Sequence, residues 1–239
     1  MTRGVFVTGT DTGIGKTFAA CTLVHALRAR GECVAVMKPV AAGAVLHAGQ
    51  WVNEDSLALM QAAEVRMDAL DRVTPILVRE PMAPHVAAAR EGRGITLAPI
   101  LAALEASRAA GTFVVAEGVG GFAVPLADGL DTIDMARAMA LPVLLVVGLR
   151  LGCLNHALLT ARAIEGSGLP FAGWIANAID PAMAAADENV EALRGRLRAP
   201  LLGRLPFRPG AAPADLAPAI DVGALLRARS GNQLGALSG

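Results

Sequence analysis

Hydrophobic residues form short continuous runs that alternate with longer segments of helical spacing along most of the chain. Because the runs do not alternate apolar with polar residues, they are typical of strands buried on both faces of a parallel sheet. We expect strands at residues 4–9, 33–40, 112–117, 142–148, 171–177 and 200–206. Helical spacing and glycine stop signals predict helices at residues 15–30, 55–63, 97–109, 132–140, 154–166 and 187–197.

This alternation predicts a doubly wound α/β fold, with a mostly parallel sheet and right-handed crossovers that place helices on both faces. Residues 41–94 are less regular and are expected to run over one end of the sheet. No repeat or long linker interrupts the pattern, so we predict a single domain over residues 1–229 and a frayed tail at 230–239. In such sheets ligands bind outside the carboxyl ends of the strands, so the residues after each strand are the functional candidates.

Composition and charge exclude several classes of protein. The 21 basic and 21 acidic residues cancel, and aromatic residues make up 3%, so the basic surface and stacking rings of a nucleic-acid binder are missing. The longest apolar run, residues 138–149, is shorter than the ~20 residues of a membrane helix, and the first residues leave no room for a signal peptide. The three cysteines lack metal-ligand spacing and suit a reducing compartment, so we expect a cytoplasmic protein.

A glycine-rich turn follows the first predicted strand, with the sequence Gly9-Thr-Asp-Thr-Gly-Ile-Gly-Lys-Thr17. Strand, turn and helix in this order predict a phosphate-binding loop of P-loop NTPase type, although Thr10 holds the usual first-glycine position. Lys16 would reach the β- and γ-phosphates and the Thr17 hydroxyl would ligate Mg²⁺. The alternative is a tight turn with a lysine near a helix start. Partitioning ATPases carry a second lysine where Asp11 stands, which argues against that subclass.

Only two of the 21 basic residues are lysines, Lys16 and Lys38. A chain that uses arginine for general surface charge is expected to keep lysine where a compact point charge is required. Lys38 lies at the end of the second predicted strand and would point at the same crevice as Lys16. The alternative for Lys38 is a solvated charge at a strand end.

Two carboxylates occupy similar positions. Asp55 begins a predicted helix, and Glu117 ends a buried strand before a glycine-rich turn, as the Walker-B acid does in P-loop enzymes. With Thr17 they would supply the hard oxygen ligands that Mg²⁺ prefers. The alternatives are an N-cap or first-turn helix carboxylate for Asp55 and an ordinary strand-terminating acid for Glu117.

Together these motifs resemble the dethiobiotin synthetases, the ATP-dependent cyclo-ligases of biotin synthesis. The matching sequences, in family order, are Gly9-Thr-Asp-Thr-x-x-Gly-Lys-Thr17, Lys38-Pro-Val, Glu80-Pro-x-x-Pro-His85, Glu117-Gly-x-Gly-Gly121, Leu151-Gly-Cys-x-Asn-His-Ala157 and Gly173-Trp-Ile-Ala-Asn177. They extend over nearly the whole predicted fold. The sequence departs from many members at Ala42, where serine is common, and at Gly13, where an acidic residue is common.

The resemblance implies catalytic roles for Lys16 and Lys38, a Mg²⁺ site at Thr17, Asp55 and Glu117, and a homodimer. The implied nucleotide contacts are Gly13, Ile14, Gly15, Lys16, Thr17, Phe18, Asp55, Glu117, Gly118, Val119, Gly120, Asn177, Pro206, Phe207 and Arg208, with Asn177, Pro206 and Phe207 around adenine. The implied substrate contacts are Ala42, Gly152, Cys153, Leu154 and Asn155, the last four serving the partner subunit's substrate. Alternatives are a turn residue for Asn177, and packing or capping for His85 and His156.

The resemblance also implies a reaction. One amine of 7,8-diaminononanoate (7,8-diaminopelargonate) captures CO₂ as a carbamate, ATP phosphorylates the carbamate, and the second amine closes the ring to give dethiobiotin, ADP and phosphate. The alternative function is a P-loop nucleotide switch or partitioning-type ATPase. A related amidoligase acting on a corrinoid would need a glutaminase domain, for which the chain is too short.

Overall fold

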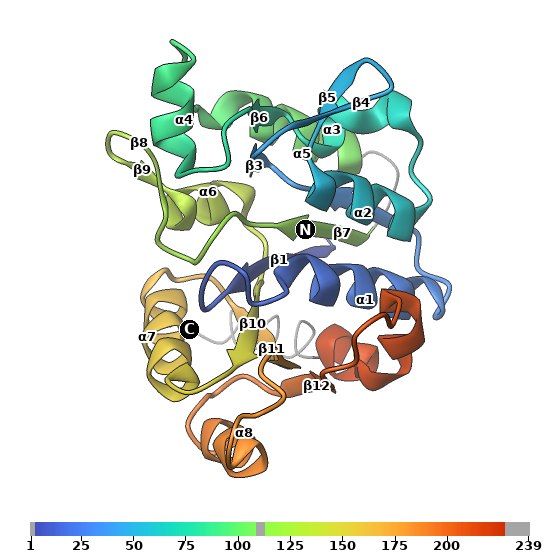
Figure 1. The fold of residues 1–239 in the computed structure, drawn as a ribbon, viewed down its shortest axis with the longest axis vertical. Coiled ribbons are helices and arrows are strands. Elements are labelled where there is room, and N and C mark those ends of the chain that lie inside the picture. Colours follow the sequence, from blue (N-terminus) through green and yellow to red (C-terminus); the bar gives the residue numbers. More distant parts are fainter. Residues whose placement is uncertain (1–2, 109–112, 228–239) are drawn as a thin grey trace, which may run out of the picture.

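The computed structural model describes residues 3–108 and 113–227. Its centre is a six-stranded sheet with the order β12-β11-β10-β1-β7-β2 (Figure 1). The strands are β1 (Gly4–Gly9), β2 (Val34–Met37), β7 (Phe113–Glu117), β10 (Val143–Leu149), β11 (Phe171–Ala178) and β12 (Leu201–Leu205). Every neighbouring pair in this sheet is parallel, which confirms the predicted doubly wound α/β architecture.

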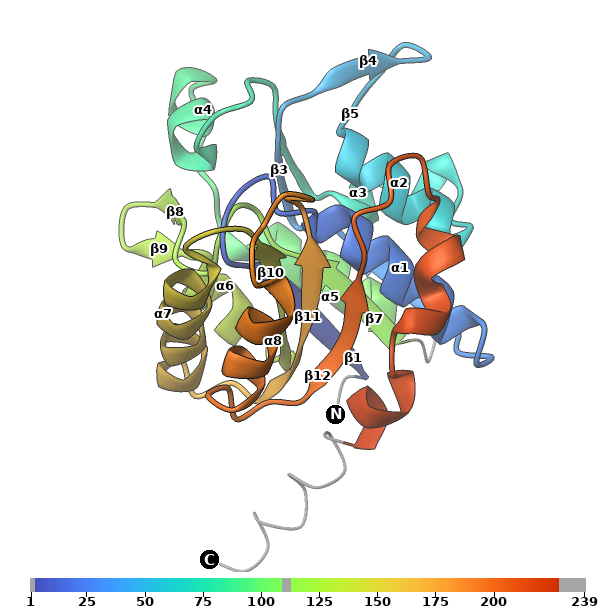
Figure 2. The same ribbon diagram turned by 60° about the horizontal axis from the view of Figure 1, so that its bottom comes forward.

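Helices cover both faces of the sheet. They are α1 (Lys16–Arg28), α2 (Glu54–Ala63), α3 (Leu70–Val73), α4 (Pro84–Arg90), α5 (Leu97–Arg108), α6 (Thr132–Met139), α7 (Cys153–Gly166) and α8 (Ala186–Arg194), with 3₁₀ turns η1 (Met67–Ala69) and η2 (Pro213–Ala219). One hydrophobic core packs α5, α6, α7 and α8 on one face, and a second packs α1, α2 and η2 on the other. Figure 2 shows α7 and α8 on the opposite side of the sheet from α1.

The central strands have no polar face because both faces carry helices. All residues of β1, β7 and β10 are buried, so their apolar runs are continuous, as the sequence indicated. This burial holds the strands in position, and therefore determines where the loops at their carboxyl ends begin.

The strand predicted at residues 33–40 is wrong in its second half. β2 ends at Met37, the Lys38 N–H donates to Val73 O at 2.7 Å, and the chain leaves the main sheet. Pro39 has no N–H to donate to a neighbouring strand, which accounts for the break. The chain continues as β3 (Val40–Ala42), which pairs in parallel with β6 (Ile76–Val78) in a separate two-stranded sheet.

The irregular segment lies over the carboxyl ends of the strands, as predicted (Figure 2). It contains a hairpin of β4 (Val45–His47) and β5 (Gln50–Val52), and α4 packs against a second hairpin, β8 (Pro125–Ala127) and β9 (Leu130–Asp131). No helix in the described part of the chain is long and apolar enough to cross a membrane. The tail predicted at 230–239 lies outside the described residues, and the single domain over 1–229 stays a prediction.

Candidate functional site

The glycine-rich loop passes from β1 into α1 and contacts Gly148 of β10 and Asn177 of β11. Gly15 has a φ of 77°, and a Cβ there would lie 2.3 Å from Asn177 Nδ2. Gly148 of β10 also needs to be glycine, because a Cβ there would lie 2.7 Å from the Ile14 side chain. The loop therefore has one tightly confined path, with its backbone close to both neighbouring strands.

Lys16 begins α1 and points back across this loop. Its Nζ donates to the Asp11 carbonyl oxygen at 3.0 Å. Burial lowers the pKa of Lys16, and the negative charge of Glu117 only partly opposes that effect. The ammonium group thus lies in a confined position that an anionic phosphate would stabilise.

Thr17, Lys38, Asp55 and Glu117, predicted from four separate parts of the sequence, come into direct contact. Thr17 Oγ1 lies 2.8 Å from both Asp55 Oδ1 and Glu117 Oε1. Lys38 Nζ lies 2.7 Å from Asp55 Oδ2 and from Glu117 Oε1. It also donates to the Gly118 carbonyl oxygen at 3.3 Å.

The two carboxylates decide the charge of Lys38. Burial alone would lower the pKa of Lys38, but the charges of Glu117 and Asp55 outweigh it and raise that pKa. Desolvation would raise the pKa of Asp55, but Lys38 outweighs it and lowers that pKa. Lys38 is therefore an ammonium ion facing an Asp55 carboxylate at neutral pH, and it is not a solvated strand-end charge.

The helix alternative for Asp55 holds in part, because Asp55 lies in the first turn of α2, but the N-cap of that helix is Asn53. The Asn53 side chain accepts from the backbone N–H groups of Asp55 and Ser56. Its Nδ2 donates to the Gly43 carbonyl oxygen at 2.8 Å, next to Ala42 at the end of β3. The sequence analysis missed Asn53, although an asparagine directly before a helix is a recognised cap signal.

The oxygen atoms at this point fit a divalent cation. Thr17 has one hydroxyl proton but two carboxylate oxygens at hydrogen-bond distance, and Glu117 Oε2 is buried with no hydrogen-bond partner among the described residues. One hydroxyl and two carboxylates are the hard oxygen donors that Mg²⁺ takes together with nucleotide phosphates. The described residues hold no cluster of three or more His, Cys, Asp or Glu side chains that could bind a metal alone.

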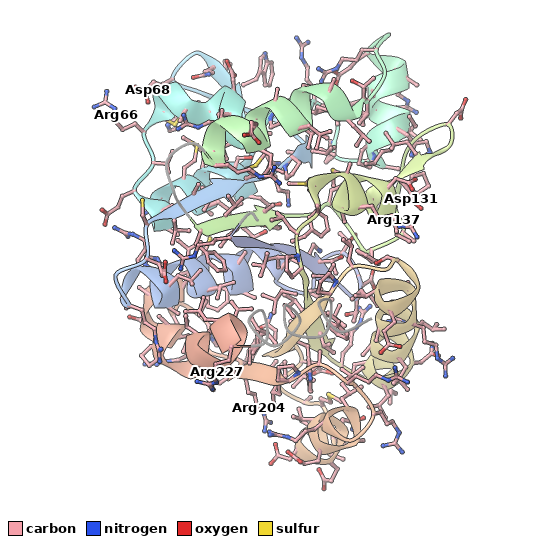
Figure 3. All side chains as sticks on the ribbon, turned by 180° about the vertical axis from the view of Figure 1, so that it is seen from behind. Arg66, Asp68, Asp131, Arg137, Arg204 and Arg227 are labelled. Carbon is pink, nitrogen blue, oxygen red and sulfur yellow. The ribbon has the colours of Figure 1, made fainter. Side chains whose placement is uncertain are left out.

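Lysines and arginines occupy different environments. Lys16 is 7% exposed and Lys38 is 3% exposed. By contrast, Arg66, Arg204 and Arg227 lie at the outer surface in ion pairs with nearby acids (Figure 3). This contrast agrees with the expectation that the chain keeps lysine for confined positions.

Asn177 lies within β11 and is no turn residue. It is buried, and its Nδ2 donates to the Ile14 carbonyl oxygen at 2.8 Å. Asn177 pairs in register with Leu205, so residues 206–208 leave β12 directly beside it. Phe207 is 46% exposed at this edge, where a flat ring could pack against it.

The segment predicted to bind substrate at residues 152–155 begins α7. Gly152, with a φ of 93°, precedes the helix, and no side chain caps it. No hydrogen bond or ion pair between described residues joins this segment to Lys38, Asp55 or Glu117. Within the described residues, His85 forms no hydrogen bond with that cluster either. Its Nδ1 lies 3.1 Å from the Pro125 carbonyl oxygen.

Arg150 is a second residue that the sequence analysis missed. It lies one residue beyond β10 and forms an ion pair with Asp11 of the phosphate loop. Its position directly after a predicted strand could have marked it. As one of many arginines, it carried no compositional signal.

Comparisons with known proteins identify relatives of the whole fold. The family model described as an AAA domain matches residues 3–215. Solved structures of a ParA family ATPase from Chlorobium tepidum TLS (TM-score 0.52, 14% identity, 95% of this chain and 98% of that one) and of the MinC:MinD cell division protein complex from Aquifex aeolicus (0.53, 17%, 96% and 95%) share the fold. At these identities the likeness shows the fold alone, and it confirms the prediction of a P-loop type sheet.

A much closer relative is the ATP-dependent dethiobiotin synthetase BioD of Aromatoleum aromaticum (strain DSM 19018 / LMG 30748 / EbN1). It is 57% identical over 215 residues, which are 90% of this chain and 95% of the relative. Identity at that level over almost the full length of both chains shows a common family. The chain belongs to the ATP-dependent dethiobiotin synthetases.

Proposed function

We propose that this ligase uses Mg²⁺ and ATP to convert 7,8-diaminononanoate and CO₂ to dethiobiotin, ADP and phosphate. The observation that carries the proposal is the contact of Lys38 with Asp55 and Glu117 beside the phosphate loop. A nucleotide switch needs the loop and its metal ligands. It has no evident need for an additional buried ammonium ion at the strand edge where a second substrate would lie.

The phosphate loop would bind and orient ATP. Backbone N–H groups after Gly13 and at the start of α1 would donate to the phosphates, and Lys16 would exchange its hydrogen bond to the Asp11 carbonyl oxygen for one to a phosphate oxygen. Thr17, Asp55 and Glu117 would hold Mg²⁺, which when bound neutralises charge on the phosphates. The adenine would lie between Asn177 and residues 206–208.

Chemistry would take place on the Lys38 side of the phosphates. One substrate amine adds to CO₂ and loses a proton to give a carbamate, whose oxygen attacks the γ-phosphorus with ADP as leaving group. The second amine then attacks the carbonyl carbon, releasing phosphate and a proton as the ring closes. Lys38, held protonated by its two carboxylates, would stabilise negative charge on the carbamate and on the transferring phosphoryl group.

Substrate would be placed by Ala42 at the end of β3 and by residues 152–155 at the start of α7. No side chain of the described residues caps the start of this 14-residue helix, and the backbone N–H groups of its first turn would suit a substrate carboxylate. We propose a homodimer in which residues 152–155 serve the partner's substrate. Leu151, 95% exposed beside them, and Leu159, 54% exposed on α7, support an interface there.

A cytoplasmic location is part of the same proposal. The chain's three cysteines are all free, and Cys33 is exposed, which suits a reducing compartment supplied with ATP.

The decisive experiment measures ADP release with and without diamine and bicarbonate, and follows labelled bicarbonate into product. We expect ADP release to depend on both and to match dethiobiotin formed one to one. Equal ATP hydrolysis without diamine would refute the ligase and favour the nucleotide switch.

Light scattering of the parent and of Leu159→Glu tests the dimer: the parent should run as a dimer, and an active monomeric parent would contradict the interface.

A further inference from the structure

Asp11 makes three separate contacts within the phosphate loop and beyond it. Its Oδ1 accepts from the Thr12 N–H at 2.7 Å, its Oδ2 pairs with Arg150 Nη2, and its carbonyl oxygen accepts from Lys16 Nζ at 3.0 Å. The bond from the Thr12 N–H lowers the pKa of Asp11 most, and the Arg150 charge lowers it further. Asp11 is thus an ionised carboxylate that orders the turn preceding Lys16.

Arg150 brings a distant part of the chain to that carboxylate. β1 and β10 are neighbouring parallel strands, so the loops that follow them leave the same edge of the sheet side by side. Arg150 follows β10 directly, and two residues later Gly152 precedes α7. The ion pair therefore connects the phosphate loop to the segment proposed to receive the substrate carboxylate.

We propose that Arg150 is a positioning residue, whose ion pair with Asp11 holds the phosphate loop and the start of α7 in one fixed arrangement. The inference rests on the proposed function for the role of the α7 segment. The contact between the two loops itself does not depend on it. When Lys16 leaves the Asp11 carbonyl for a phosphate, the Arg150 contact keeps Asp11 in place.

The exposure of the pair makes this role testable. The side chains of Arg150 and Asp11 are 41% and 43% exposed, and ion pairs that water reaches contribute little to folding stability. Removing the pair should thus leave the protein folded and show its effect in ligand binding. A contact needed only for stability would show the opposite pattern.

The experiment is a double-mutant cycle of Arg150→Met and Asp11→Asn, with binding of a non-hydrolysable ATP analogue measured by calorimetry. Asparagine keeps the acceptor for the Thr12 N–H, and methionine keeps an unbranched chain. We expect each single variant to weaken analogue binding about three- to tenfold, and the double variant to be no weaker than the worse single one. KM for the diamine should rise while kcat changes little. Arg150→Lys should restore most of the analogue affinity and most of the KM.

Arg3→Met is the matched control, since Arg3 forms an exposed ion pair with Glu32. Arg3 directly precedes β1, at the end of that strand opposite the phosphate loop. It should leave analogue binding unchanged. Two results would overturn the inference: analogue affinity within twofold of the parent in both single variants, or additive losses in the double variant. If the parent binds the analogue and the losses in the variants are non-additive, but the parent makes no dethiobiotin, the proposed function is refuted. The inference about the contact between the two loops is then unaffected.

Discussion

Lys38→Met is the change that tests the centre of the site most directly. It removes an ammonium nitrogen that lies 2.7 Å from Asp55 Oδ2 and from Glu117 Oε1, and keeps a side chain of similar length. Glu117 is fully buried, so its carboxylate would be left without its cation. Removing one partner of a buried ion pair costs about 3–5 kcal/mol. For a chain of this size that cost corresponds to a fall in Tm of roughly 6–20 °C.

The same variant should lose turnover more than nucleotide affinity. Losing a preorganised charge at the reacting oxygens typically lowers turnover by about 10²–10³. ATP binding should stay close to the parent's, because Lys16 and the loop N–H groups are unchanged. Lys38→Arg should rescue poorly, since the guanidinium group is longer and flatter than the place between the two carboxylates. Lys16→Ala should weaken ATP binding as well.

The assays are thermal unfolding with and without Mg²⁺, ATP affinity by calorimetry, and dethiobiotin formation from diamine and bicarbonate. Mg²⁺ alone should recover more of the Tm in Lys38→Met than it adds to the parent, because a cation then returns to Asp55 and Glu117. A variant with parental Tm and parental turnover would show that Lys38 neither balances the carboxylates nor takes part in the reaction.

Three further predictions rest on the packing, exposure or charge of single residues. Gly148→Ala should push Ile14 out of place and weaken ATP binding, whereas Gly166→Ala, where a Cβ meets nothing within 4 Å, should not; equal affinities would contradict the packing. A bulky thiol reagent should modify Cys33 alone in the folded protein, because the other two cysteines are buried, and Cys33→Ser should abolish the fast reaction. Since burial lowers the pKa of Lys16 from 10.5, analogue affinity should fall with rising pH before an ordinary lysine would titrate, and Lys16→Arg should remove that fall.

Some parts of the candidate site could be predicted from the sequence because their chemistry is local. The glycine-rich turn and Glu117 are each recognisable from a buried strand and the few residues that follow it. The ion pair of Arg150 with Asp11 and the hydrogen bond from Asn53 to the Gly43 carbonyl oxygen could not be predicted in the same way, because each depends on which loops meet after folding. Arg150 and Asp11 are 139 residues apart in sequence.

The break after β2 was predictable and shows what a purely hydrophobic pattern overlooks. The run at residues 33–40 is apolar enough for one strand, but Pro39 lies inside it and cannot donate to a ladder. The break has a functional consequence. Because the backbone turns away at Lys38, its side chain reaches the carboxyl end of β7, where Glu117 lies, while the chain continues into β3.

The two lysines of the candidate site differ in pKa because their surroundings differ. Lys16 has a carbonyl oxygen as its partner and its pKa is lowered by burial, so its charge is best stabilised once phosphates arrive. Lys38 has two carboxylates and keeps its proton without any ligand. If Lys38 turns toward a reacting oxyanion, Asp55 and Glu117 lose their balancing charge, and another cation must replace it at the same oxygens. In the proposed mechanism, nucleotide, divalent cation and Lys38 would therefore be linked through Glu117 Oε1, which lies within 2.8 Å of both Thr17 Oγ1 and Lys38 Nζ.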